Sequence, residues 1–216
     1  MSKLQGPEMA PASGQVERLV ILLHGLGADG RDLLGLAPEL ADDLPDTQFC
    51  SPNAPFPCDM APYGYQWFSL RDRDPVRILT EMSIAMPMLN DYIDAQAARF
   101  GLDDSQVALI GFSQGAMMSM FTSIRRVKPL AGIVAMSGIL RSQEAMVADV
   151  KSRPPICVIH GTDDEVVPFA ALAITEEALK SANIPAESHA RPGLGHGIDM
   201  ACIEITKKFL TRCFKL

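Results

Sequence analysis

Short apolar runs alternate along the chain with longer segments in which apolar residues recur at helical spacing. The short runs are continuously aliphatic, as strands of a parallel sheet are when both of their faces are buried. They predict strands over residues 18–24, 47–51, 106–112, 131–136 and 156–160, and an edge strand over 186–191. The segments between them predict helices near residues 31–43, 77–100, 114–127, 168–182 and 199–213, with Pro87 kinking or dividing the second.

This alternation predicts an α/β fold in which a mostly parallel central sheet is covered by helices on both faces. Residues 1–15 are polar and contain Pro and Gly, so a flexible N-terminal segment is expected there. Residues 16–216 contain no repeat and no linker, which predicts a single domain. A chain of 216 residues leaves no room for a separate lid domain beside it.

One segment, residues 52–75, interrupts the alternation. It contains five prolines and five aromatic residues, and a long loop without regular structure in a compact domain is often functional. We expect it to line a substrate pocket, with Trp67, Phe68 and Met60 in contact with substrate. The alternatives are a loop that packs on the surface through its own aromatic residues, or one that Trp67 anchors in the core.

The strongest motif is Gly111-Phe112-Ser113-Gln114-Gly115, which has the pattern G-x-S-x-G. It lies between a predicted strand and a predicted helix, as a nucleophile elbow requires. There a sharp turn holds the serine in a strained conformation, and glycines on either side remove side chains that would collide. The N-terminus of the helix then faces developing negative charge. Ser113 is therefore the candidate nucleophile.

A serine hydroxyl needs a base to activate it, and in this arrangement an acid and a histidine follow the serine in the chain. His196 stands in a glycine-rich loop just before the last predicted helix, where its imidazole has room to reach the serine. His160 ends a strand, and His189 lies in the predicted edge strand, where a structural role is expected. His196 is therefore favoured as the base.

The acid should lie on the loop that follows the strand ending at His160. Asp163, Asp164 and Glu165 all qualify by position, and spacing alone does not separate Asp164 from Asp163.

Residues 25–30 (GLGADG) match G-x-G-x-x-G, the dinucleotide-binding fingerprint, and so offer a nicotinamide-dependent oxidoreductase as a rival interpretation. A dinucleotide fold needs an acidic residue at the end of the next strand to hold the ribose, and that strand ends in FCSP without one. As the loop after an early strand of a hydrolase, the same residues bring the backbone N–H of Leu26 toward the substrate carbonyl, beside the N–H of Gln114. These two N–H groups are the candidate oxyanion hole, and His24 is expected to hold the loop in shape.

Four segments together resemble motifs of the carboxylesterase/lysophospholipase family of the α/β-hydrolases, which includes the acyl-protein thioesterases. The segments are HGLGADGRDL at 24–33, GFSQGAMMS at 111–119, HGTDDEVVP at 160–168 and GLGHGI at 193–198. The resemblance implies an α/β-hydrolase fold with Ser113, Asp164 and His196 as a catalytic triad.

The same resemblance implies oxyanion N–H groups at Leu26 and Gln114. The family's Trp-Phe/Tyr-Asp sequence is matched by Trp67-Phe68, with Ser69 in place of the aspartate. The resemblance also implies hydrolysis of esters, thioesters or lysophospholipids through an acyl-serine intermediate, without a metal or an organic cofactor. Without a lid domain, the site is expected to be an open cleft, which covers only a few methylenes of a bound chain. Short to medium acyl chains are therefore expected. A hydrolase-fold binding protein without turnover is the rival from another class, and its mark would be a broken triad or elbow.

Composition and charge narrow the choice of partners. The net charge of -7 and the lack of a long Lys/Arg cluster disfavour nucleic acid. Five cysteines, an odd number with no C-x-x-C pair, favour neither a disulfide framework nor a zinc site. No apolar run near the N-terminus resembles a signal peptide or could span a bilayer. We therefore expect a cytoplasmic enzyme that acts on a small-molecule acyl ester without stable membrane insertion, and a homodimer is compatible with the sequence.

Overall fold

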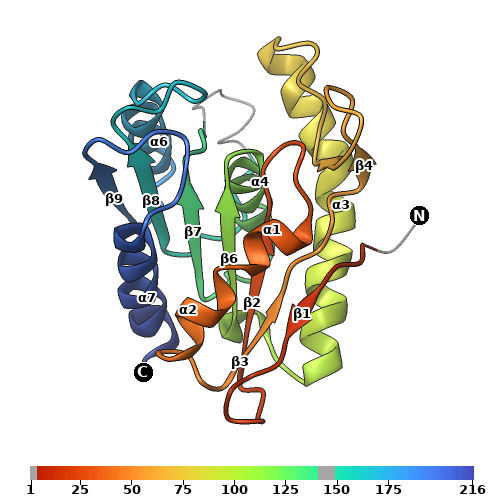
Figure 1. The fold of residues 1–216 in the computed structure, drawn as a ribbon, viewed down its shortest axis with the longest axis vertical. Coiled ribbons are helices and arrows are strands. Elements are labelled where there is room, and N and C mark those ends of the chain that lie inside the picture. Colours follow the sequence, from red (N-terminus) through yellow and green to blue (C-terminus); the bar gives the residue numbers. More distant parts are fainter. Residues whose placement is uncertain (1–3, 141–148) are drawn as a thin grey trace.

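A computed structural model describes residues 4–140 and 149–216, in which helices pack on both sides of a central sheet (Figure 1). The strands are β1 (Glu8–Met9), β2 (Arg18–Leu23), β3 (Thr47–Cys50), β4 (Phe56–Pro57), β5 (Tyr65–Gln66), β6 (Val107–Phe112), β7 (Gly132–Met136), β8 (Ile156–Gly161) and β9 (Ala186–Arg191). The helices are α1 (Gly30–Leu34), α2 (Ala37–Ala41), α3 (Pro75–Phe100), α4 (Gln114–Ser123), α6 (Ala170–Ser181) and α7 (Met200–Phe214), with a 3₁₀ turn at Asp104–Gln106.

The central sheet has seven strands in the order β1-β3-β2-β6-β7-β8-β9. The pairs from β3 to β9 are parallel, and β1 pairs with β3 in the antiparallel direction. Each of the six predicted strands is present, with each end within one residue of its predicted position. The mostly parallel sheet confirms the predicted α/β fold, and it places the carboxyl ends of β2, β6, β7 and β8 along one edge of the molecule, at the top of Figure 1.

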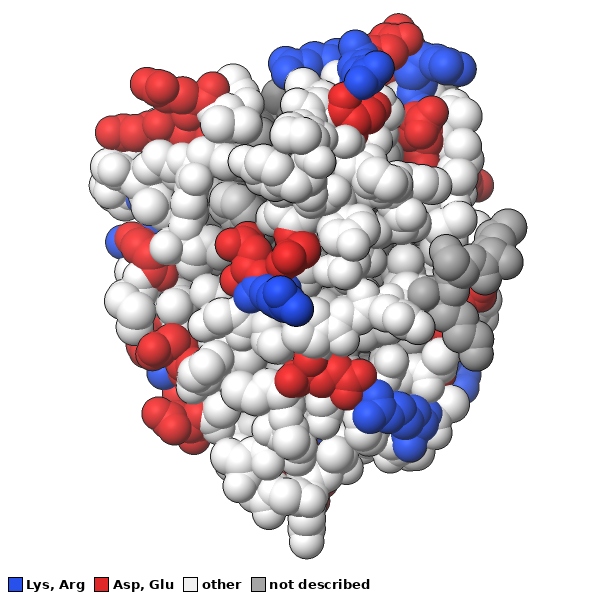
Figure 2. All heavy atoms as spheres, turned by 45° about the vertical axis from the view of Figure 1, so that its right-hand side comes forward, with Lys and Arg blue, Asp and Glu red and all other residues white. Residues whose placement is uncertain are grey.

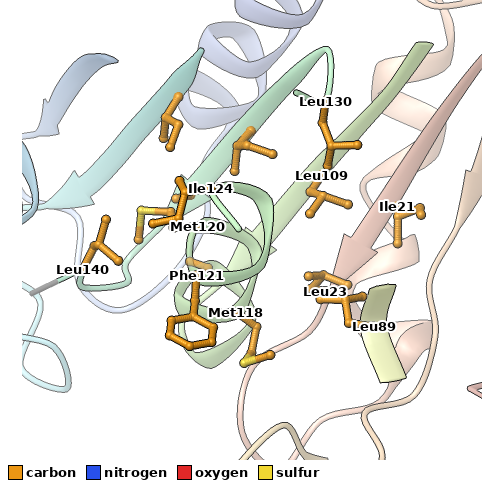
Figure 3. Packing of buried hydrophobic residues seen from close by; sticks show 14 of the residues in the cluster. Ile21, Leu23, Leu89, Leu109, Met118, Met120, Phe121, Ile124, Leu130 and Leu140 are labelled. Carbon is orange, nitrogen blue, oxygen red and sulfur yellow. The ribbon is translucent and has the colours of Figure 1, made fainter. Parts of the chain in front are cut away.

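Two separate apolar clusters cover the two faces of the sheet. One joins alternate residues of the strands to α3, α4 and α6, and Figure 3 shows part of it, with Ile21, Leu23 and Leu109 from the strands and Met118 and Phe121 from α4. The other joins the intervening strand residues to α1, α2 and α7. Because both faces are buried, the strands read as continuous apolar runs, which is why the sequence locates them so closely.

The N-terminal segment differs from the flexible stretch that the sequence predicts over residues 1–15. Residues 1–3 lie outside the described part of the chain, but Glu8–Met9 form β1 along the edge of β3. The backbone N–H of Asn53 also donates to the carbonyl of Gln5 (2.8 Å). Backbone groups make these contacts and any residue supplies them, so polar composition does not reveal the pairing.

The helix predicted over 114–127 ends four residues early, because α4 stops at Ser123, and two other predicted helices differ from the prediction in their continuity. The helix predicted over 31–43 is two short helices, since α1 ends at Leu34, with Gly35 as its C-cap, and α2 begins with Pro38 in its first turn. In one continuous helix the ring of Pro38 would collide with the carbonyl of Leu34, four residues earlier. By contrast, α3 continues through Pro87, which does not divide it. Buried residues on both sides of Pro87, including Ala85 and Leu89, keep α3 packed on the sheet.

The long loop of residues 52–75 contains a small hairpin, in which β4 and β5 pair in the antiparallel direction. It crosses the edge of the sheet where the parallel strands end, and its backbone is tied to the loop after β2, since Gly27 N–H donates to the carbonyl of Tyr65 (2.9 Å). Across residues 4–140 and 149–216, no helix combines the length and the apolar character that crossing a membrane requires.

Candidate active site

Ser113 lies on a strained turn between β6 and α4. Its backbone has φ 54° and ψ −115°, in the left-handed half of conformational space that non-glycine residues avoid. A Cβ on Gly111 would lie 2.4 Å from the carbonyl oxygen of Gly115, and one on Gly115 would lie 1.9 Å from that of Leu23. Both glycines of the motif are therefore required by close backbone packing, as the elbow interpretation predicts.

Three side chains from separate loops meet at the carboxyl edge of the sheet. Nε2 of His196 lies 3.0 Å from Oγ of Ser113, and Nδ1 of the same ring lies 2.8 Å from Oδ2 of Asp164. Ser113 follows β6, Asp164 follows β8, and His196 precedes α7. With Nδ1–H donating to the carboxylate, Nε2 is left as an acceptor that faces the serine hydroxyl.

The loop after β8 separates the three acidic candidates. Asp164 is buried, and its Oδ1 accepts hydrogen bonds from the N–H groups of Val166 (2.9 Å) and Val167 (2.8 Å). Burial alone would raise the pKa of Asp164, but the hydrogen bonds from His196 and from these backbone N–H groups outweigh it and lower that pKa. The carboxylate is thus held ionised.

The other two acids do not reach His196. Asp163 is exposed, and its Oδ1 accepts from the hydroxyl of Thr162 (2.7 Å). Glu165 is exposed as well. The fold therefore makes the distinction that spacing along the chain leaves open.

His160 is hydrogen-bonded to the loop that carries Asp164. Its ring is fully buried, and Nε2–H donates to the carbonyl of Val167 (2.8 Å) while lying 3.5 Å from Oδ2 of Asp164. His189 lies on the edge strand β9 and pairs with Glu187 (3.2 Å). Neither ring is part of the hydrogen-bonded path to Ser113, in agreement with the choice of His196 from the sequence.

Two backbone N–H groups beside Ser113 have no hydrogen-bond partner within the described residues. They belong to Leu26 and Gln114, and both residues line the cavity next to Ser113. The N–H of Ser113 itself donates to the carbonyl of Met136 (2.8 Å) and so faces away from that space. One free donor at the N-terminus of α4 and a second from the loop after β2 form the kind of arrangement that stabilises an oxyanion.

His24 shapes the loop that carries Leu26, as the sequence predicts. Its ring is fully buried, with Nδ1 2.7 Å from the carbonyl of Gly25 and Nε2 accepting from the N–H of Ala54 (3.0 Å). Since a carbonyl only accepts, Nδ1 carries the proton and the ring is neutral. Desolvation by burial lowers the pKa of His24, which keeps it uncharged.

An apolar cavity of about 720 Å³ opens beside Ser113 and His196. One wall comes from the loop before α3 and from α3 itself, and a second comes from the loop after β8 and from α6. The larger apolar side chains of these walls are those of Met60, Leu70, Ile78, Leu79, Met82, Val166, Val167 and Ile174, and Met117 of α4 and Ile139 after β7 also line the cavity. Met60 is thus placed in the wall, as expected.

Trp67 and Phe68 correct the expectation for the long loop, because they do not line the cavity. Both side chains are fully buried in the core. The indole N–H of Trp67 donates to the carbonyl of His24 (3.0 Å), and the side-chain amide of Gln114 accepts from Trp67 N–H (2.8 Å) and donates to the Phe68 carbonyl (2.7 Å). Trp67 therefore anchors the loop, which is the alternative that the sequence left open.

Ser69, in place of the aspartate that the family resemblance leads one to expect, has its own partner. Its hydroxyl donates to Oδ2 of Asp59 (2.6 Å), and the N–H of Asp59 donates to the side-chain oxygen of Gln66 (3.0 Å). The side chain of Arg71 donates to the carbonyl of Asp59. The carboxylate that ties this loop together comes from ten residues upstream of Ser69.

Some residues of the site give no signal in the sequence. The walls formed by α3 and α6 are helix positions whose apolar character predicts burial in general, and only the packing of the helices decides that they face the cavity. Gln114 was expected only as a backbone donor, and its side-chain amide also ties the elbow to the long loop. A polar side chain directly after the nucleophile, at a position buried by the helix start, is the one hint of this role.

One group of side chains within the described residues lies close enough to hold a metal ion. The potential ligand atoms of Cys157, Glu187 and His189 lie within 4.8 Å of one another on β8 and β9. Glu187 already forms an ion pair with Arg212, and its other carboxylate oxygen lies 3.2 Å from Nε2 of His189. The carboxylate is therefore neutralised by the protein itself, and no metal is assigned to this group.

The sequence profile of the phospholipase/carboxylesterase family matches residues 4–214. The chain belongs to this family. The crystal structure of esterase PE8 is 38% identical, superimposes with a TM-score of 0.93, and is matched over 98% of this chain and 100% of that one. Acyl-protein thioesterase 1 of Neurospora crassa is 26% identical over 95% of this chain and 90% of its own length. Carboxylesterase SOBER1 of Arabidopsis thaliana is 26% identical over 91% of this chain and 90% of its own length.

Membership in the phospholipase/carboxylesterase family agrees with the fold and excludes the dinucleotide-binding interpretation of residues 25–30. In the structure that segment borders the cavity beside Ser113, and Gly25 lies against Ser113, where an added Cβ would be 3.4 Å from the serine Cβ. The protein is an α/β-hydrolase enzyme, as the four sequence motifs imply.

Proposed function

We propose that this family member hydrolyses carboxylic esters by acyl transfer through Ser113, with His196 as base and Asp164 as the acid that orients it. The observation that carries the proposal is the continuous hydrogen-bonded path from Ser113 through both ring nitrogens of His196 to Asp164, beside an apolar cavity. The names of the relatives, esterase, carboxylesterase and thioesterase, support an acyl bond as the one cleaved.

The first half of the reaction acylates the enzyme. Oγ of Ser113 attacks the acyl carbon as its proton passes to Nε2 of His196, and the oxygen of the tetrahedral intermediate accepts from the N–H groups of Leu26 and Gln114. The bond between the acyl carbon and the alcohol oxygen then breaks, and this oxygen takes the proton from Nε2. The alcohol departs, and acyl-Ser113 remains. Asp164 favours the charged ring through its hydrogen bond to Nδ1–H.

The second half returns the enzyme to its starting state. Water gives a proton to Nε2 of His196 and attacks the acyl carbon. The bond from that carbon to Oγ of Ser113 then breaks, Oγ takes the proton back from Nε2, and the carboxylic acid is released. Both halves use the same base and the same oxyanion donors, so no metal or organic cofactor enters any step.

Esters with short to medium acyl chains are the substrates that we propose, and thioesters are open to the same mechanism. Each buried CH₂ stabilises the bound chain by about 0.8 kcal/mol, and the cavity walls are apolar on both sides of Ser113. The five cysteines are all free thiols, which supports a reducing compartment such as the cytoplasm.

The test is labelling and turnover in wild type and Ser113→Ala. An active-site-directed fluorophosphonate should label the native protein at Ser113, located by peptide mass spectrometry, and the alanine variant should neither be labelled nor turn over a panel of esters and thioesters. Thermal unfolding of both proteins serves as the control that the variant is folded. Full activity in Ser113→Ala, or labelling at another residue, would contradict the proposal.

A further inference from the structure

Among the residues that the structure describes, two in the wall of the cavity are charged, Asp32 and Arg73, and the other lining residues are apolar or polar and uncharged apart from the imidazole of His196. Arg73 stands in the loop directly before α3, next to the apolar wall residues Leu70 and Ile78. A substrate chain that follows this wall away from Ser113 therefore meets apolar side chains and one guanidinium.

Arg73 differs from the two arginines on either side of it. Arg71 forms an ion pair with Asp59 (3.6 Å) and donates to its backbone carbonyl, and Arg77 pairs with Asp72 (3.8 Å). Arg73 is exposed and has no hydrogen bond or ion pair within the described residues. In Figure 2 positive and negative side chains gather together at the top of the molecule, where α3 begins.

The two acidic residues that flank Arg73 in the chain, Asp72 and Asp74, have partners of their own, since Asp72 pairs with Arg77. Asp74 caps α3, where its Oδ1 accepts from the N–H groups of Val76 (2.9 Å) and Arg77 (3.2 Å). Asp32 belongs to α1, beside the loop that carries Leu26, and its carboxylate forms no ion pair with Arg73. Among the described residues, none therefore neutralises the positive charge on the α3 wall by direct contact.

From this arrangement we infer that Arg73 is a specificity-determining residue and that the enzyme favours esters whose apolar chain ends in an anionic group, a carboxylate or a phosphate. The inference rests on the proposed esterase function and names its substrate class. A guanidinium presents paired donors that match a carboxylate or phosphate in a bidentate contact. The net charge of -7 repels anions from the molecule as a whole, so this local cation has to supply the attraction.

The position of Arg73 sets the size of the expected effect. Because the side chain is exposed, water and salt screen the contact, and an exposed ion pair changes an equilibrium by about twofold to fivefold. The preference should depend on chain length, since only one length of chain places its anion at the guanidinium while the ester lies at Ser113.

The experiment compares matched pairs of esters, one neutral with a terminal methyl and one with a terminal carboxylate, at several chain lengths. In one arm the carboxylate ends the acyl chain with a common leaving group, and in the other it ends the alcohol of an acetate ester. The measured quantity is the ratio of kcat/KM for the anionic ester to that for the neutral ester. The two arms distinguish which part of the substrate follows the α3 wall.

In at least one arm, the ratio should peak at one chain length in wild type and fall about twofold to fivefold in Arg73→Ala. It should fall further in Arg73→Glu, and raised salt should lower it in wild type toward the Arg73→Ala value. Arg77→Ala, which removes an arginine of the same helix start that does not line the cavity, should leave the ratio unchanged. An unchanged ratio in Arg73→Glu in both arms would overturn the inference. Failure of wild type to hydrolyse the neutral esters would instead count against the proposed function.

Discussion

Asp163 and Asp164 are adjacent and chemically identical, yet the fold gives them different surroundings. The carboxylate of Asp164 is buried and accepts a hydrogen bond from the ring of His196, whereas that of Asp163 is exposed and bonds Thr162. Two backbone N–H groups and one imidazole N–H converge on Asp164, which holds its pKa low in spite of burial. The distinction is made by the direction of each side chain, which spacing in the sequence does not record.

We therefore expect Asp164→Asn to reduce kcat about 10⁴-fold, because an amide no longer fixes the tautomer of His196 that leaves Nε2 free to accept the serine proton. Asp163→Asn, the matched control one residue away, should change kcat far less, since its exposed side chain bonds Thr162 and no hydrogen bond among the described residues joins it to His196 or Ser113. Steady-state kinetics on a common ester, with thermal unfolding of both variants, measures this. A greater loss of kcat in Asp163→Asn would mean that Asp163, and not Asp164, is the acid.

At the scale of elements, the loop of residues 52–75 serves two purposes with different side chains. Trp67 is fully buried and ties the loop to His24 and Gln114, whereas Met60 is 52% exposed and lines the cavity. Anchoring and substrate contact are thus separated within a single loop. The separation has consequences that a pair of substitutions can measure.

Trp67→Ala should destabilise the fold by about 3–5 kcal/mol, because it removes a large buried ring and leaves the carbonyl of His24 without its donor. Its kcat/KM should fall by a similar factor for short and long acyl chains, since the loss reaches substrate only through the position of the loop. Trp67→Phe keeps most of the buried ring and is the milder variant if the alanine protein does not fold.

Met60→Ala is the matched variant in the same loop. It should leave the melting temperature nearly unchanged and lower kcat/KM more for long acyl chains than for acetate, because it removes apolar wall. Thermal unfolding and kcat/KM over a series of acyl chain lengths, measured for Trp67→Ala, Trp67→Phe and Met60→Ala, test these two roles. A chain-length dependence in Trp67→Phe with none in Met60→Ala would reverse the two roles.

The elements of this chain were predicted from the sequence unevenly, for physical reasons. Strands buried on both faces leave continuous apolar runs, and the elbow, the acid loop and the histidine loop each carry glycine or acidic residues that local geometry demands. Trp67 was misplaced because an apolar ring satisfies the same pattern whether it faces a cavity or the core. The break between α1 and α2 was missed because the apolar spacing continues across Gly35 and Pro38, and only the backbone restriction at Pro38 ends it.

On the scale of the whole molecule, the sheet has two edges and protects each differently. On β9, the free edge carries Glu187, His189 and Arg191 at alternating positions, and charged edge strands resist pairing with other chains. Without β1, the strand at the opposite edge of the sheet would be β3, which is short, uncharged and fully buried in the folded protein. Strand β1 covers it, and the ion pair of Glu8 with Arg99 (2.7 Å) holds β1 against α3.

Deletion of residues 1–10 tests whether this cover contributes to stability. The deletion removes the β1–β3 pairing and the bonds from the N–H groups of Ser51 and Asn53 to the N-terminal segment (3.0 and 2.8 Å). Two such bonds contribute about 1–3 kcal/mol together, and for a chain of this size 1 kcal/mol shifts the melting temperature by about 2–4 °C. We expect the melting temperature to fall by roughly 5 °C and the protein to associate through the exposed edge of β3, as seen by size-exclusion chromatography.

Glu8→Ala, which removes only the exposed ion pair, should change the melting temperature by less than about 3 °C. An unaltered melting temperature after the deletion would mean that the segment adds no stability, as the flexible N-terminus predicted from the sequence would require.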